Sequence, residues 1–130
     1  MSRPYSPAQP VARLTVRAQP EVLALCRHAL AGVLTDVAID EDTVEDLKLV
    51  LSELCKNVIE HAYTGDEGVI DIEFRISPDE FVTTVRDHGR GIADNATRGT
   101  GWSALASLAA RHSVEAAGSG GVLVTFASPL

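Results

Sequence analysis

The sequence has few aromatic residues, only two cysteines and no long apolar run. Three Phe, two Tyr and one Trp occur in 130 residues, so Leu, Val, Ile and Ala must supply most of the core. Cys26 and Cys55 are too few for a disulfide framework and fall at apolar positions of expected helices, which predicts buried free thiols. No run approaches the roughly 18 apolar residues of a membrane span, and the N-terminus lacks the apolar segment of a secretion signal. We therefore expect a cytoplasmic protein with no membrane partner.

Basic residues are also scarce. The chain has 11 Lys and Arg against 18 Asp and Glu, a formal net charge of −7 at pH 7. Proteins that bind nucleic acid neutralise phosphates with a basic face, so this balance argues against a nucleic-acid partner. A small anionic ligand is compatible with it, because helix N-termini and glycine-loop amides bind phosphates without net positive charge.

Length and periodicity predict one domain with helices on one side of a sheet. We expect a proline-containing flexible leader at 1–10 and a single domain at 11–130. Period-two and helical patterns predict strands at 11–18, 70–76, 81–86, 113–117 and 122–127, and helices at 20–33, 43–63 and 102–111. The middle helix should begin at a capping box of Thr43 and Asp46. Because strands come in hairpin-like pairs with helices between them, we expect an α+β fold, a two-layer sandwich with a mixed sheet covered by helices on one face.

The middle helix carries a polar pair at the edge of its apolar stripe. Glu53 and Asn57 are four residues apart, so their side chains lie about 40° apart on one shoulder of the helix. A carboxylate and an amide placed there could line a cleft, and their oxygens are ligands that Mg²⁺ accepts. An ordinary amphipathic boundary with two solvated polar groups gives the same pattern.

Two glycine-containing segments follow. Asp87-His88-Gly89-Arg90-Gly91 comes directly after a predicted strand, where glycines allow the backbone to approach another group closely. The stretch from Arg98 to Gly101 precedes a predicted helix, where free backbone N–H groups could meet phosphates. Taken alone, the first is compatible with a plain polar turn and the second is a weak signal, since it is neither a Walker A loop nor a complete dinucleotide fingerprint.

Taken together, the three features resemble the motifs of the ATPase superfamily that includes gyrase, heat-shock chaperones and histidine kinases. Residues 53–57 (ELCKN) are similar to its N box, residues 87–91 (DHGRG) to its first glycine box, and residues 99–101 (GTG) to its second. The run LSELCKNVIEHAY is most similar to the bacterial anti-sigma-factor serine/threonine kinases. The resemblance covers residues 11–127 and implies the Bergerat-type, histidine kinase-like ATPase fold.

The resemblance implies a role for each matching residue, with ATP and Mg²⁺ as cofactors. Asn57 would coordinate Mg²⁺, Glu53 would act as the general base, and Asp87 would accept from the adenine amino group. Gly89 and Gly91 would let the chain pass close to the nucleotide. Four residues would close over the phosphates: Arg98, Gly99, Thr100 and Gly101.

The resemblance also implies partners. The protein would phosphorylate a serine or threonine of an anti-sigma-factor antagonist and sequester a sigma factor, and this branch commonly forms homodimers. The alternative is a nucleotide-gated protein-binding module without kinase activity. One departure favours that alternative: the family places an adenine-binding threonine two residues after the glycine that opens the last strand. Counted from Gly121, that position holds Leu123, and Thr125 could replace it only if the strand were shifted.

Overall fold

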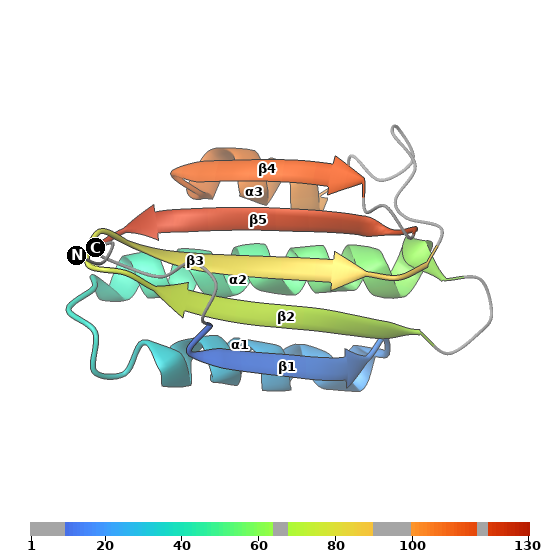
Figure 1. Ribbon diagram of the computed structural model, residues 1–130, viewed down its shortest axis with the longest axis horizontal. Coiled ribbons are helices and arrows are strands. Elements are labelled where there is room, and N and C mark those ends of the chain that lie inside the picture. The colour runs from blue at the N-terminus through green and yellow to red at the C-terminus, as the bar shows by residue number, and fades with distance from the viewer. Residues whose placement is uncertain (1–9, 64–67, 90–99, 117–119) are drawn as a thin grey trace, which may run out of the picture.

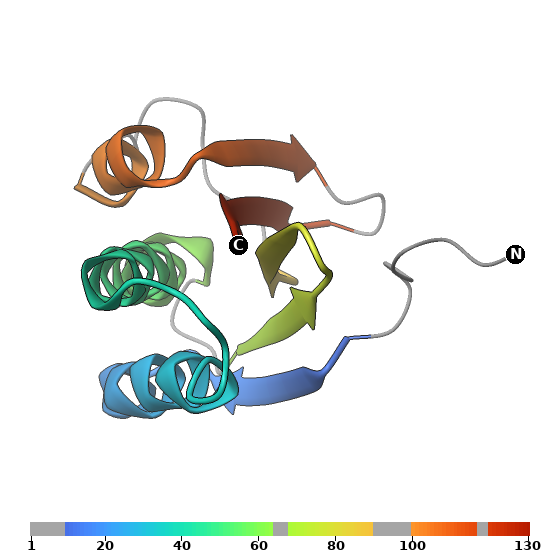
Figure 2. The same cartoon turned by 90° about the vertical axis from the view of Figure 1, so that its left-hand side faces the viewer.

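The alternating segments form five strands, and the segments with helical periodicity form three α-helices that cover one face of the sheet (Figures 1 and 2). The computed structural model describes residues 10–63, 68–89, 100–116 and 120–130, so residues 1–9 of the leader expected at 1–10 lie outside the described residues. In chain order the elements are β1 (Ala12–Arg17), the 3₁₀ turn η1 (Pro20–Val22), α1 (Leu23–Val33), α2 (Glu41–Asn57), the π-helical turn η2 (Val58–Ala62), β2 (Val69–Ile76), β3 (Glu80–Asp87), α3 (Thr100–Leu108), β4 (Arg111–Ala116) and β5 (Val122–Pro129). The expected α+β sandwich is confirmed.

The sheet is antiparallel throughout, so the expectation of a mixed sheet was wrong in this respect. The strand order is β1-β2-β3-β5-β4, and all four neighbouring pairs are antiparallel. A single helix joins β3 to β4, and these two strands do run in the same direction, since each is antiparallel to β5. They are not neighbours, because β5 lies between them. The last strand therefore separates the two strands that a single helix connects.

One face of the sheet is buried under the helices. Alternate residues of β2, β3 and β5 point toward the helices, and the three phenylalanines, Phe74, Phe81 and Phe126, are fully buried there. The rings of Phe74 and Phe81 stack with centroids 5.9 Å apart. Cys26 of α1 and Cys55 of α2 are free and buried, as the sequence predicts. None of the helices in the described ranges is long and apolar enough to cross a membrane.

The long helix begins earlier than expected and ends with a wider turn. Its N-cap is Asp40, whose side chain accepts a hydrogen bond from the backbone N–H of Thr43 at 3.2 Å. The predicted capping box was therefore wrong, because the acidic residue three positions before Thr43 already satisfies that N–H group. At the other end the chain changes to the π-helical turn η2, and Tyr63 follows in an extended conformation. Such turns are rare and often occur at functional sites.

Replacing the N-cap should measurably destabilise the fold. Asp40→Ala removes the acceptor for Thr43 N–H and a negative charge at the helix N-terminus, so we expect the free energy of unfolding to fall by about 1 kcal/mol. Chemical denaturation measures it, with Asp36→Ala as the control, since Asp36 is exposed in the preceding loop. Equal stability of the two variants would contradict this assignment of the cap.

Candidate functional site

Asn57 is the last residue of α2 and lies buried at the end of the helix, with 8% of its surface exposed. Its Nδ2 atom is buried and has no hydrogen-bond partner within the described residues. A buried polar group without a partner costs about 1–3 kcal/mol, so it needs an explanation. An external group that binds the amide provides one. The assignment of oxygen and nitrogen in such an amide can be exchanged, so the amide can offer either a donor or an acceptor.

Glu53, one helical turn before Asn57, is half-buried and faces solvent-accessible space. It lines a shallow hollow of about 350 Å³ at the surface of α1 and α2. Beside it, Arg27 of α1 donates a hydrogen bond to the hydroxyl of Ser52 at 3.3 Å. The structure thus places a carboxylate where a group of another molecule can reach it.

Asp87, the last residue of β3, is buried on the side of the sheet that faces the helices, with 1% of its surface exposed. The backbone N–H of Gly89 donates to its Oδ1 atom at 3.1 Å. Burial raises the pKa of Asp87, although hydrogen bonds from the backbone of Gly89 and Val122 oppose this shift. A carboxylate with spare acceptor capacity in a buried position suits a ligand that donates hydrogen bonds.

Two glycines pack the ends of the strands closely against other backbone. A Cβ atom at Gly89 would overlap the carbonyl oxygen of Ala62, at the end of η2. A Cβ atom at Gly121 would overlap the carbonyl of Asp87, and the φ of Gly121 is +88°, which favours glycine. The resemblance assigned Gly89 to a close approach of the nucleotide. In the structure, the protein's own backbone already requires a glycine there.

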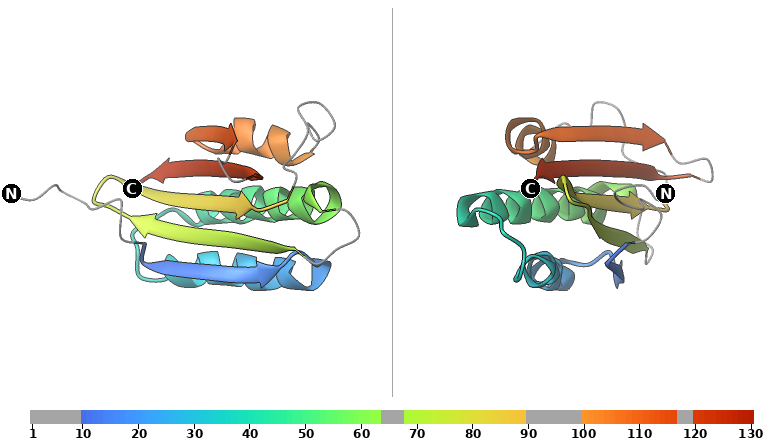
Figure 3. Two further views of the ribbon diagram at one scale, coloured as in Figure 1. Left: turned by 45° about the vertical axis from the view of Figure 1, so that its right-hand side comes forward. Right: turned by 60° about the vertical axis from the view of Figure 1, so that its left-hand side comes forward.

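The end of α2 and the end of β3 lie at the same end of the sandwich (Figures 1 and 3). The contact of Gly89 with Ala62 joins them, so Asn57 and Asp87 approach the same region from the two layers. Thr100 and Gly101 are the first residues of α3, which packs beside α2. Gly91, Arg98 and Gly99 lie outside the described residues. The structure therefore brings together the end of α2 and the end of β3, which carry two of the predicted motifs.

The last strand does not present either candidate for the missing threonine to this region. Leu123 pairs with Arg86 and Thr125 with Thr84, and these residues lie on the open face of the sheet, away from the helices. The residue that faces the same side as Asp87 is Val122, whose backbone N–H donates to the Asp87 carboxylate. Successive strand residues point to opposite faces, so neither Leu123 nor Thr125 can reach the side of the sheet on which Asp87 lies. The apolar side chain of Val122 occupies the position beside Asp87.

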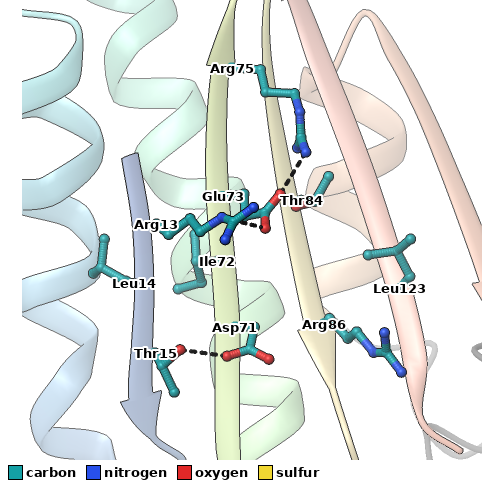
Figure 4. A pocket seen from close by; sticks show the side chains of 10 residues that line it. All are labelled: Arg13, Leu14, Thr15, Asp71, Ile72, Glu73, Arg75, Thr84, Arg86 and Leu123. Carbon is teal, nitrogen blue, oxygen red and sulfur yellow. Dashed lines mark hydrogen bonds and ion pairs between the residues drawn. The ribbon is translucent and has the colours of Figure 1, made fainter. Parts of the chain in front are cut away.

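The open face of the sheet carries a different polar cluster (Figure 4). It surrounds a hollow of about 480 Å³ whose polar side chains pair with one another across and along the strands. Glu73 binds Arg13 at 3.1 Å and Arg75 at 2.8 Å, and the hydroxyl of Thr15 donates to Asp71 at 2.7 Å. The pairs of β2 with Arg13 and Thr15 of β1 are cross-strand pairs, which stabilise a sheet without any ligand, and the pair of Glu73 with Arg75 lies within β2. The hollow lies on the opposite side of the sheet from Asp87, so it is separate from the candidate site.

Comparison with known proteins identifies the fold family. The model of the family described as "Histidine kinase-like ATPase domain" matches residues 16–127. The chain belongs to this family. The histidine kinase-like ATPase domain accounts for the covered sheet and for the two motif-bearing ends that meet beside Gly89, and it implies that the protein uses a nucleotide.

Individual relatives support the same fold. The chain is 38% identical over 77 residues to the serine-protein kinase RsbW of Bacillus subtilis (strain 168), and 36% identical over 76 residues to that of Bacillus cereus (strain ATCC 10987 / NRS 248). Each match covers 58% of this chain and 48% of the relative, so the chain spans about half the length of these proteins. The crystal structure of the RsbU and RsbW domains of Rv1364c from Mycobacterium tuberculosis is similar with a TM-score of 0.69 and 22% identity, over 91% of this chain and 32% of that one.

Adding a methyl group at Gly89 should disturb the contact between helix and strand. In Gly89→Ala the new Cβ overlaps the Ala62 carbonyl, so we expect the free energy of unfolding to fall by about 1–3 kcal/mol, the usual cost of overpacking. Gly32→Ala is the matched control, because nothing lies within 4 Å of the Cβ position in this helical residue. That variant should gain about 0.5–1 kcal/mol. Equal unfolding midpoints for the two variants in denaturant would refute the close contact.

Proposed function

We propose that this histidine kinase-like ATPase domain is an ATP-dependent serine/threonine-protein kinase that acts as an anti-sigma factor and phosphorylates an anti-sigma-factor antagonist. The observation that carries the proposal is the pair on α2, a solvent-accessible Glu53 one turn before a buried, unpartnered Asn57. A protein that only binds nucleotide has no need of a carboxylate at this position. The relatives named serine-protein kinase RsbW support the same activity.

Asp87 would hold the adenine ring. A carboxylate offers only acceptors, and the adenine amino group offers donors. Asp87 accepts from the backbone N–H groups of Gly89, at 3.1 Å, and Val122, and it is buried at the strand end, where water competes little for its remaining acceptor capacity. The nucleotide phosphates would then extend toward Asn57 and the start of α3 at Thr100 and Gly101. Gly91, Arg98 and Gly99 would complete the phosphate site.

Asn57 fits a site for Mg²⁺ bound with the phosphates. Within the described residues no group of three or more His, Cys, Asp or Glu side chains could hold a metal ion by itself. Mg²⁺ commonly takes few protein ligands and fills its remaining positions with phosphate oxygens and water. The unpartnered atom of Asn57 is placed as the amide nitrogen, and exchange of the amide oxygen and nitrogen would present the oxygen as a single protein ligand of this kind. When bound, Mg²⁺ would neutralise phosphate charge during transfer.

Glu53 would orient the hydroxyl of the protein substrate and accept its proton. The hollow beside it opens at the surface between α1 and α2, so a segment of a partner protein can approach the carboxylate from that side. The proposed partners are the antagonist, as substrate, and a sigma factor, whose sequestration places the protein in the cytoplasm. A homodimer would be consistent with the branch that the chain resembles. No nucleic acid takes part.

A nucleotide-gated binding module without kinase activity is the second candidate. The observation that favours it is Val122, an apolar residue on the same side of the sheet as Asp87, where a threonine would have been able to hydrogen-bond with the ligand. This candidate shares the nucleotide site and lacks only the phosphotransfer step. A test of Glu53 therefore separates the two.

Exchanging Asp87 for an amide should abolish most nucleotide binding while the fold persists. Asp87→Asn presents a donor to the adenine amino donor, so we expect the dissociation constant for Mg·ATP to rise about tenfold or more by calorimetry. The control is Asp79→Asn, an exposed residue at the opposite end of β3. Wild-type protein should melt at a higher temperature with millimolar Mg·ATP. Unchanged affinity of the Asp87 variant would remove this residue from the site.

The same variant has an expected effect on pH dependence. Since burial raises the pKa of Asp87, the folded state holds the proton more tightly than the unfolded state. The contribution of Asp87 to the free energy of unfolding is complete below the usual Asp pKa. It is lost as the pH rises through the raised pKa of the folded state. Without nucleotide, wild type should lose stability across that window and Asp87→Asn should not show this loss.

Exchanging Glu53 for Gln should leave nucleotide affinity intact and remove most phosphotransfer. Gln keeps the shape and helix propensity of Glu but cannot accept a proton at neutral pH, so the ~10²–10⁴-fold contribution of a positioned base should be lost. Single-turnover transfer from ATP to the antagonist measures it. Glu41→Gln, an exposed residue in the first turn of α2 that lies outside this hollow, is the control. If Glu53→Gln transfers at the wild-type rate, its role as a base is excluded. If no transfer occurs with any antagonist while ATP binds, the binding module is the better account.

A further inference from the structure

Tyr63 makes two hydrogen bonds at the junction of α2, β2 and β3. Its hydroxyl donates to the backbone carbonyl of Val69 at 2.6 Å and accepts from the backbone N–H of His88 at 2.9 Å. Val69 is the first residue of β2, and His88 directly follows β3. A single side chain at the end of the long helix thus binds both strands of the hairpin.

The Tyr63 hydroxyl lies where the backbone hydrogen bonds between β2 and β3 would otherwise continue. The last described pair is Ile70 with Asp87, and the same antiparallel register would next oppose Val69 to His88. Instead of bonding to each other, these two backbone groups are bridged by Tyr63. The position of the chain immediately after Asp87 therefore depends on a side chain that belongs to the helix layer.

The ring of Tyr63 is held in place as well. A Cβ atom at Gly68 would overlap the ring, so Gly68 leaves the space that the ring fills. The carbonyl of Gly68 accepts a hydrogen bond from the backbone N–H of Ala18 at 2.9 Å. This bond connects Gly68, against which the ring packs, to the end of β1. The π-helical turn η2 ends at Ala62 and Tyr63 leaves it in an extended conformation, so the wide turn directs Tyr63 out of the helix.

We infer that Tyr63 is a positioning residue for the nucleotide site, which fixes the carboxylate of Asp87 relative to α2 through the backbone of His88. This inference rests on the proposed function of Asp87. His88 and Gly89 are the two residues after Asp87, and Gly89 N–H is itself a donor to the Asp87 carboxylate. Displacement of His88 would therefore shift both the carboxylate and the N–H group that orients it. Tyr63 would act on the base-binding end of the site and not on the phosphates.

Removal of the hydroxyl tests this role. Tyr63→Phe keeps the ring against Gly68 and breaks both bridges, so we expect the dissociation constant for ATP to rise about tenfold. Inosine triphosphate carries an oxygen in place of the adenine amino group and should lose much less affinity. The preference for ATP over inosine triphosphate should thus shrink, while single-turnover transfer at saturating ATP should stay at the wild-type rate. A residue with only a structural role would weaken both nucleotides equally.

The matched control lies at the other end of the same hairpin. The hydroxyl of Ser77 accepts from the backbone N–H groups of Asp79 and Glu80 at 3.2 and 3.1 Å and donates to the carbonyl of Glu80 at 3.3 Å. Ser77→Ala therefore breaks three bonds between a side chain and the backbone, against two in Tyr63→Phe. We expect similar losses of melting temperature in the two variants, and unchanged nucleotide preference in Ser77→Ala. In wild type, hydrogen exchange at the His88 amide should slow on binding ATP.

The outcomes separate this inference from the proposed function. If wild type binds no ATP, both fail. If wild type binds ATP and Asp87→Asn does not, but Tyr63→Phe keeps the wild-type preference for ATP, the inference alone is overturned. An exchange rate at the His88 amide that saturating ATP leaves unchanged overturns it too, even if Tyr63→Phe does not fold.

Discussion

The structure of the candidate site depends on one contact, between the end of the long helix and the end of β3. The carbonyl of Ala62 occupies the space that a side chain at position 89 would need, and the hydroxyl of Tyr63 joins the two strands beside it. Because α2 and its π-helical turn lead directly into this contact, it sets how far Asn57 on the helix lies from Asp87 on the strand. Gly89 of the glycine motif is thus required by the packing between the two layers.

Polar groups on the two faces of the sheet are in different electrostatic situations. On the open face, Glu73 is bound by Arg13 and Arg75, so its charge is balanced within the protein. On the helix side, the amide of Asn57 lacks a partner within the described residues and burial disfavours the charge of Asp87. The unpartnered amide and the buried carboxylate both lower the stability of the protein without ligand. Perturbed groups of this kind cluster at functional sites. This contrast supports the choice of the helix side over the larger hollow on the open face.

The sequence predicted the helices and strands well because their periods of 3.6 and two residues are local patterns. It did not predict features that depend on residues far apart in the chain. Asp40 was missed as a cap because Thr43 and Asp46 present the same spacing pattern three residues later. The antiparallel sheet was missed because no local signal shows that β5 lies between β3 and β4. Tyr63 appeared only as the end of a helix motif, since its partners Val69 and His88 are 6 and 25 residues away. The family resemblance named residues, but the face on which Leu123 lies required the register.

The place of β5 in the sheet has a consequence for how the chain folds. Among the described strands, β4 pairs only with β5, and β3 has no neighbour on that side until β5 is added. Residues 122–129 must therefore reach the middle of the sheet after every other strand has left the ribosome. Such non-local pairing slows folding and leaves strand edges exposed meanwhile. During synthesis, one edge of β3, the strand that ends at Asp87, therefore stays unpaired until β5 has been made.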